Sequence, residues 1–315
     1  MKKTTNRSST KPTGPTLPAW LFERTPPDTL EAAAFASGSA LSFLYVVLMD
    51  PNIDVPGDLL RSRLALRAAV HSNKIEGRQT TEAELRDAYH LTAPGDTLGP
   101  NGDMLAFWRK GADIRLKASD WQDRLGALLG KSMRDDVSVW LNAPSKTESP
   151  VERAGALLGQ LLIDYPRQEA NALLCADVVL ARSLGWPKPV PLLGHTLKKA
   201  DIRLISDGAD RRLTLHHAIA RAAQETIRLS YDLGRRAALL REVAPKLRSK
   251  GADDAVRLFL TEDAVIISPM LTPIIRGSKT AMTPRSALRM CDRLVALGVA
   301  KELTGRPSFR LYGLG

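Results

Sequence analysis

The sequence has few cysteines and lacks the pattern of a secretory signal. Cys175 and Cys291 are its two cysteines, and both stand in apolar helical surroundings. This excludes a disulfide scaffold and a zinc site built from cysteines. The N-terminus is basic, but no apolar run follows it directly. We therefore expect a protein of the reducing cytoplasm.

A long membrane-type run is nearly absent as well. Ala32–Met49 carries no charge over 18 residues, which is the lower limit for crossing a bilayer. The run holds Gly38 and three serines, and Asp50 and Pro51 end it. We expect a buried core helix and no membrane contact, with a spanning helix or an interfacial helix as alternatives.

Motifs for catalysis and cofactor binding are also absent. Gly95, Gly99 and Gly102 lie in an Asp/Pro-rich turn that lacks the Lys-Ser/Thr pair of a phosphate-binding loop. His216 and His217 are adjacent, so on a helix they point about 100° apart and are poorly placed to share a metal. The sequence predicts no cofactor, no metal and no catalytic residue. An active site assembled only by the fold remains an alternative.

The charge is strongly positive and concentrated near the C-terminus. The formal net charge is +11 and the pI is about 9.8, which favours an anionic partner. Residues 276–315 hold eight Arg and Lys, against Asp292 and Glu302 as the acidic residues. This local excess is typical of a surface that meets phosphates.

The chain divides into three predicted parts. Residues 1–28 are rich in Lys, Thr, Ser and Pro and should form a flexible basic tail, or alternatively an arm that contacts DNA. Residues 29–250 should form an all-helical domain and residues 251–315 a separate small domain. Helical periodicity is expected over Thr29–Met49, Leu59–Lys74, Thr81–His90, Gly102–Leu116, Ser119–Leu129, Val151–Asp164, Gln168–Leu184 and Leu213–Ala244. Nothing before Val299 alternates like a strand, so we expect a mainly α protein.

The C-terminal segment has clear helix and strand signals. Thr283 is a suitable N-cap, Pro284 suits the first helical position, and Gly298 suits the position after the last turn. The predicted buried stripe of this helix consists of Leu288, Cys291, Leu294 and Val295. Two short strands should follow, Val299–Leu303 and Ser308–Tyr312, joined by the turn Thr304-Gly305-Arg306-Pro307.

A helix that leads into a basic two-stranded ribbon resembles the end of a winged helix-turn-helix. Arg285, Arg289 and Arg293 lie at i, i+4 and i+8, so they share one face of the predicted recognition helix. The other predicted nucleic-acid-binding residues are Ser286, Lys301, Arg306 and Arg310. The preceding segment contains Pro269 and Pro273, so the first helix of the pair is poorly specified.

These features predict a DNA-associated protein without enzymatic activity. Duplex DNA is the expected partner, and a transcriptional regulator or a plasmid-maintenance factor would both fit. Because small winged modules also bind proteins, a scaffold with a protein partner is an alternative. The oligomeric state is not predicted, because no coiled-coil heptad is present.

A second distinctive segment is typical of the boundary between two helices. It consists of Ser72-Asn73-Lys74-Ile75-Glu76-Gly77. Gly77 should end one helix, and Thr81 with Glu84 should form the capping box of the next. The Ser72, Glu76 and Gly77 pattern also resembles the inhibitory motif of Fic-domain nucleotidyl transferases, in which the Glu blocks ATP phosphates. Since the Fic catalytic His and its phosphate loop are absent, the resemblance implies a catalytically silent relative, or otherwise a nucleotide-handling enzyme.

A closer resemblance covers most of the chain. It rests on RSRLALRAA (61–69), ELRDAYHLTAPGDTLGPNG (84–102), VAPKLRSKGADDAVRLFLTEDAV (243–265) and LTGRPSFRLYGL (303–314). These segments are similar to an uncharacterised family of alphaproteobacterial proteins of about this length, whose members are often encoded on large plasmids. The resemblance implies a bacterial cytosolic protein and no catalytic residue.

Overall fold

The computed structural model describes residues 18–22, 25–93, 95–142, 149–208, 211–247, 250–306 and 308–315. It is mainly helical, with a small antiparallel sheet near the C-terminus, which confirms the predicted fold class at this level. The helices of the body are α1 (Leu30–Met49), α2 (Gly57–Ile75), α3 (Glu82–His90), α4 (Gly99–Ala112), α5 (Trp121–Gly126), α6 (Lys131–Asn142), α7 (Pro150–Asp164), α8 (Glu169–Ser183), α9 (Lys199–Ser206) and α10 (Arg211–Val243). The body also has short 3₁₀ helices at Ala19–Phe22 and Ala244–Lys246.

The starts of α3 and α7 are stabilised by hydrogen bonds between side chains and nearby backbone N–H groups. Thr81 and Glu84 form the predicted capping box at the start of α3. Ser149 and Glu152 form a second capping box at α7, which the sequence analysis did not anticipate. In both cases a side-chain oxygen satisfies a backbone N–H that the first turn leaves without a partner. The short helices α6 and α9 were not predicted from the sequence.

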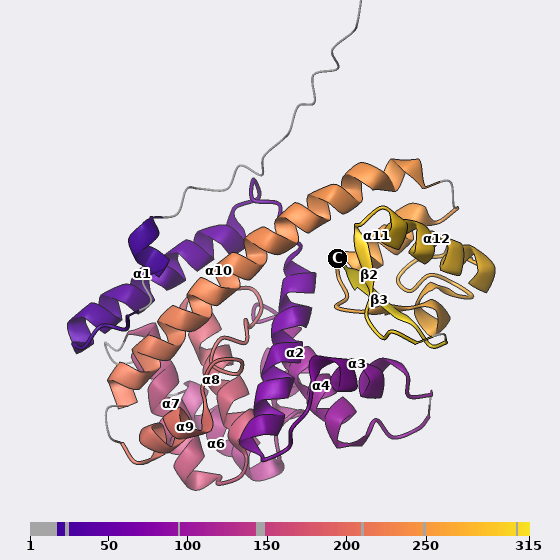
Figure 1. Ribbon diagram of the computed structural model, residues 1–315. Coiled ribbons are helices and arrows are strands. Elements are labelled where there is room, and N and C mark those ends of the chain that lie inside the picture. Colours follow the sequence, from indigo (N-terminus) through magenta and orange to yellow (C-terminus); the bar gives the residue numbers. More distant parts are fainter. Residues whose placement is uncertain are drawn as a thin grey trace, which may run out of the picture.

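The long helices α1 and α10 lie side by side across one face of the body (Figure 1). The expected core helix α1 is buried along one face only, through residues such as Ala40 and Leu44, while Phe35 and Tyr45 are exposed. Within the described part of the chain, α1 is long and apolar enough to cross a membrane by length and composition, and 33% of its most apolar window is buried.

Part of the predicted N-terminal tail is folded. Residues 1–17, 23 and 24 lie outside the described residues. Ala19–Phe22 instead forms a 3₁₀ helix whose Leu21 is buried, and the Trp20 ring lies 5.6 Å from that of Phe35. The structured chain therefore begins before residue 28, because an apolar segment follows the polar one.

The residues from α11 to β3 form a compact group that we call the C-terminal unit (Figure 1). It contains α11 (Ala252–Phe259), β1 (Val265–Ile266), a helical turn at Ile267–Leu271, α12 (Pro284–Ala296), β2 (Ala300–Glu302) and β3 (Leu311–Leu314). The antiparallel sheet has the order β1-β3-β2, with Val265 opposite Tyr312 and Lys301 opposite Gly313.

Two expectations about this unit need correction. The sheet has a third strand, β1, whose two residues are too few to show alternation in the sequence. The segment before α12 holds only the turn Ile267–Leu271, with non-helical backbone at Ser268 and Pro269, so a regular first helix of a helix-turn-helix pair is absent from the described residues there. Proline removes a backbone donor and clashes with the preceding turn, which explains the break.

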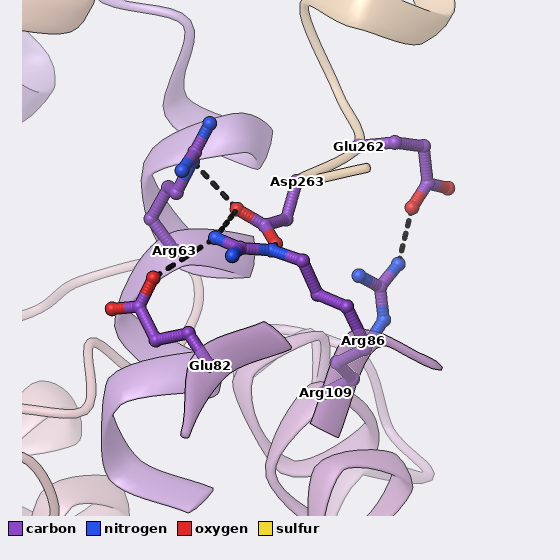
Figure 2. A network of polar contacts seen from close by, with 6 residues as sticks. All are labelled: Arg63, Glu82, Arg86, Arg109, Glu262 and Asp263. Carbon is purple, nitrogen blue, oxygen red and sulfur yellow. Dashed lines mark hydrogen bonds and ion pairs between the residues drawn. The ribbon is translucent and has the colours of Figure 1, made fainter. Parts of the chain in front are cut away.

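A buried ionic network joins the C-terminal unit to the body (Figure 2). Asp263, which precedes β1, lies 2.5 Å from Nε of Arg86 in α3 and 2.6 Å from Nε of Arg63 in α2. Beside it, Arg109 of α4 pairs with Glu262. Gly313 of β3 also lies close to Arg63. These contacts hold the sheet against the body and so fix the direction in which α12 faces.

Candidate nucleic-acid interface

The candidate interface is built on α12, whose ends match the sequence prediction. Thr283 accepts a hydrogen bond from the backbone N–H of Ser286 at 3.3 Å, and Pro284 occupies the first turn. At the other end, Gly298 has a φ of 71°, and the N–H of Val299 bonds to the carbonyl of Leu294. This left-handed glycine cap ends the helix and leads the chain directly into β2.

The buried face of α12 differs from the predicted stripe. Cys291 and Leu294 are buried as expected, whereas Leu288 is 39% and Val295 is 36% exposed. The remaining buried residues are Ala287 and Met290. The apolar face is therefore rotated toward Ala287 and Met290, because the helix packs on β2 and on the turn at Ile267–Leu271.

Arg285, Arg289 and Arg293 lie on the exposed side of α12, as the spacing predicts. Within the part of the chain that the structure describes, none of these three guanidinium groups has a carboxylate partner. The sheet lies on the body side of the unit, and α12 lies on the side away from α2 (Figure 1). The three side chains are thus free to meet a partner from solvent.

The other predicted nucleic-acid-binding residues differ in their exposure and in their partners. Lys301 of β2 is exposed, and Ser286 is partly exposed in the first turn of α12. Arg306 pairs with Asp87 of α3, so the loop between β2 and β3 is attached to the body. Arg310 donates through Nε to the carbonyl of Arg306 at 3.1 Å and lies 3.8 Å from Asp292. Arg306 and Arg310 therefore already have partners within the protein.

Glu302 shapes the β2–β3 loop, a role that the sequence analysis did not assign. Its carboxylate accepts hydrogen bonds from the backbone N–H of Thr304 at 2.8 Å and of Gly305 at 2.9 Å. Although burial acts in the opposite direction, a hydrogen bond from the Thr304 hydroxyl and these two backbone bonds hold the pKa of Glu302 below its ordinary value. A groove of about 420 Å³ lies between this loop and α12, lined by Asp292, Val295, Glu302, Gly305, Arg306, Arg310 and Tyr312.

One known protein family matches nearly the whole chain. Residues 5–314 match the family described as "Protein of unknown function (DUF1403)". The chain belongs to this family. The match confirms membership of a family of unknown function, as the four sequence segments predict. No curated protein matches the chain.

In this family member, Ser72 and its neighbours build the turn between α2 and α3. Ser72 is buried and accepts a hydrogen bond from Nε1 of Trp108 at 2.9 Å. Glu76 pairs with Arg78 at 2.5 Å. Gly77 has a φ of 87°, which favours glycine. These contacts account for the motif as a structural element, and the resemblance to Fic proteins stays a prediction.

Asn73 is the centre of the same turn. It is fully buried, and its amide nitrogen lies 3.0 Å from Oγ1 of Thr80 and 3.1 Å from Oδ1 of Asn101, while Arg78 donates to its amide oxygen.

Over the described ranges, no group of three or more His, Cys, Asp or Glu side chains could hold a metal ion. The chemistry available on α12 is therefore that of exposed guanidinium groups.

Proposed function

We propose that the C-terminal unit binds duplex DNA through α12 and that the protein acts without catalysis, in transcription or in plasmid maintenance. The observation that carries the proposal is the row of Arg285, Arg289 and Arg293 on the exposed side of α12. Guanidinium groups spaced by one helical turn can bond to successive phosphates and to guanine edges in a major groove.

The order of the elements supports this proposal. A winged helix has a helix and a strand, then two helices, then two strands joined by the wing, and its sheet has the order first-third-second. Here α11, β1, α12, β2 and β3 follow that order, with the sheet order β1-β3-β2. The short turn at Ile267–Leu271 stands where the second helix would be.

The contacts of the C-terminal unit suggest a division of roles. Arg285, Ser286, Arg289 and Arg293 would dock in the groove, with Lys301 on the flanking backbone. Arg306 and Arg310 would contribute fully only after leaving Asp87 and Asp292, which now hold them. Releasing partly exposed ion pairs of this kind costs about 1 kcal/mol each, so DNA can compete for both side chains.

A protein partner is the second candidate, because Leu288 and Val295 are exposed on α12. The two residues are seven positions apart, so they lie on one side of the helix, and Val295 also lines the groove beside the β2–β3 loop. An apolar edge next to basic residues also suits a protein surface. In this case the intact chain would ignore DNA but copurify with a protein.

The direct test is binding of the intact chain to labelled duplex DNA, followed by fluorescence anisotropy from about 50 to about 200 mM salt. The proposal expects affinity to fall steeply as salt rises, because each phosphate contact releases counterions. Lack of binding at the lowest salt concentration would contradict the proposal and favour the protein partner.

A further inference from the structure

A cavity between α1, the start of α7 and α10 is separate from the C-terminal unit. Its volume is about 720 Å³, and its lining includes Arg212 and His216 from the first turns of α10. The ribbon diagram shows α1 and α10 running side by side (Figure 1). We propose that this cavity binds a small, mostly apolar molecule with a neutral head group that donates a hydrogen bond. This inference does not depend on DNA binding.

The size and the walls of the cavity fit such a ligand. Pockets for small molecules usually have volumes of about 300–1,000 Å³, with mostly apolar walls and a few polar groups. The apolar wall here is formed by Ala34, Leu41, Tyr45, Val46, Val151 and Leu184. Tyr45 and Val46 line the cavity and are exposed, so a ligand that contacts them would remove apolar surface from water.

Gly38 keeps the middle of the α1 wall open. It lines the cavity, and a Cβ atom added at Gly38 would meet no other atom within 4 Å. Glycine inside a helix costs about 1 kcal/mol of stability relative to alanine. The space beside Gly38 is therefore available to a ligand, and a larger side chain at this position would fill it.

The polar end of the cavity holds a buried hydroxyl–imidazole pair. Oγ of Ser37 lies 2.7 Å from Nδ1 of His216, and the Ser37 hydroxyl donates to the carbonyl of Ala34 at 3.0 Å. Because a hydroxyl has one hydrogen, Nδ1–H of His216 must donate to Ser37. Burial lowers the pKa of His216, so the ring is neutral near pH 7 and its Nε2 is an acceptor.

The charged residues at this end cancel one another. Glu152 lines the cavity and pairs with Arg212, which reaches it from the first turn of α10. The available acceptors are thus the Glu152 carboxylate and Nε2 of His216. They favour a neutral donor such as a hydroxyl or an amine N–H, whereas a ligand carboxylate has no hydrogen to donate to them.

The test uses the intact chain and N-phenyl-1-naphthylamine, a neutral fluorescent molecule with two apolar ring systems and one N–H. Saturable binding is expected, and Gly38→Phe should weaken it at least about tenfold. Gly38→Ala should change affinity by less than about twofold, because a methyl group fits the open space. Phe35→Ser is the matched control, since Phe35 is 65% exposed on the same helix but does not line the cavity.

Competition distinguishes the head groups. 1-Naphthol should displace the probe at lower concentration than 1-naphthoate, which has the same rings and a carboxylate. Equal displacement by the two, unchanged binding in Gly38→Phe, or loss of binding in Phe35→Ser would each overturn the proposal. Thermal unfolding checks the folding of each variant, and Val46→Trp is a second blocking variant if Gly38→Phe does not fold.

Discussion

Arg86 of α3 and Asp263 of the C-terminal unit form a buried ion pair, with 2.5 Å between Nε and Oδ2, although 177 positions separate them in sequence. Their side chains are only 8% and 3% exposed. Burial alone would raise the pKa of Asp263, but Arg63 and Arg86 hold it below its ordinary value. This charge pair joins the unit that carries α12 to the helical body (Figure 2).

Replacing Asp263 by Ala should destabilise the protein by about 3–5 kcal/mol, because Arg63 and Arg86 would lose their shared buried partner. The measurement is denaturant unfolding at neutral pH. Asp232→Ala is the control, since Asp232 pairs with Arg235 and Arg236 at the surface and should contribute less than about 1 kcal/mol. Similar losses in the two variants would show that the network does not anchor the unit.

His90 should make the protein less stable at mildly acidic pH. Burial is the main cause that lowers its pKa to about 3; Arg109, Arg276 and Arg86 act in the same direction, and Asp263 opposes them. The unfolded chain binds a proton below about pH 6.5, and the folded chain does so only near pH 3. The contribution is therefore complete above pH 6.5 and is lost as the pH falls.

We expect the wild type to lose up to about 1.4 kcal/mol per pH unit below pH 6.5 from this residue. His90→Gln cannot titrate and should lose less stability between about pH 7 and about pH 5. Chemical unfolding of both proteins at the two pH values measures the difference. Parallel losses in the two proteins would show that His90 titrates normally.

Ser72→Ala tests the structural role of the turn between α2 and α3. The change leaves Nε1–H of Trp108 buried without its acceptor, which should cost about 1–3 kcal/mol. Glu76→Ala removes only a partly exposed ion pair with Arg78 and should cost less than about 1 kcal/mol. Thermal or chemical unfolding compares the two, and the reverse order of losses would contradict this assignment.

Asp87→Asn should strengthen DNA binding if the β2–β3 loop takes part. The change weakens the pair that now holds Arg306 and removes one negative charge near the proposed interface. We expect a gain of about two- to fivefold at low salt, which corresponds to less than about 1 kcal/mol. Asp50→Asn, at the end of α1, is the matched change in charge. An equal gain in both variants would point to net charge alone.

Local signals made much of α12 predictable. Thr283 and Pro284 mark its start and Gly298 marks its end, because each satisfies a requirement of nearby backbone. Leu288 and Val295 were predicted to be buried, which is wrong, because both lie at the edge of the apolar stripe and are exposed. Whether such edge positions are covered depends on the neighbouring elements, which helical spacing does not reveal.

Contacts between residues far apart in the chain could not be predicted from the sequence. Asp263 carries no local sign that Arg63 and Arg86 surround it, and Ser37 contacts His216 across 179 positions. Arg306 was predicted to contact nucleic acid from the turn between the two strands, but the packing of the loop on α3 pairs it with Asp87. Such pairs arise from the packing of whole elements, so only the three-dimensional arrangement places them.

The central claim is tested most directly by reversing one charge on α12. Arg289→Glu in the intact chain should weaken duplex DNA binding about tenfold or more and lower the salt slope by about one. Arg203→Glu, the same change on an exposed position of α9, should bind like the wild type across the salt series. Point variants are preferable to truncation, because removing the C-terminal unit would leave Arg86 without Asp263. If Arg289→Glu also binds like the wild type, α12 is not the surface that meets DNA.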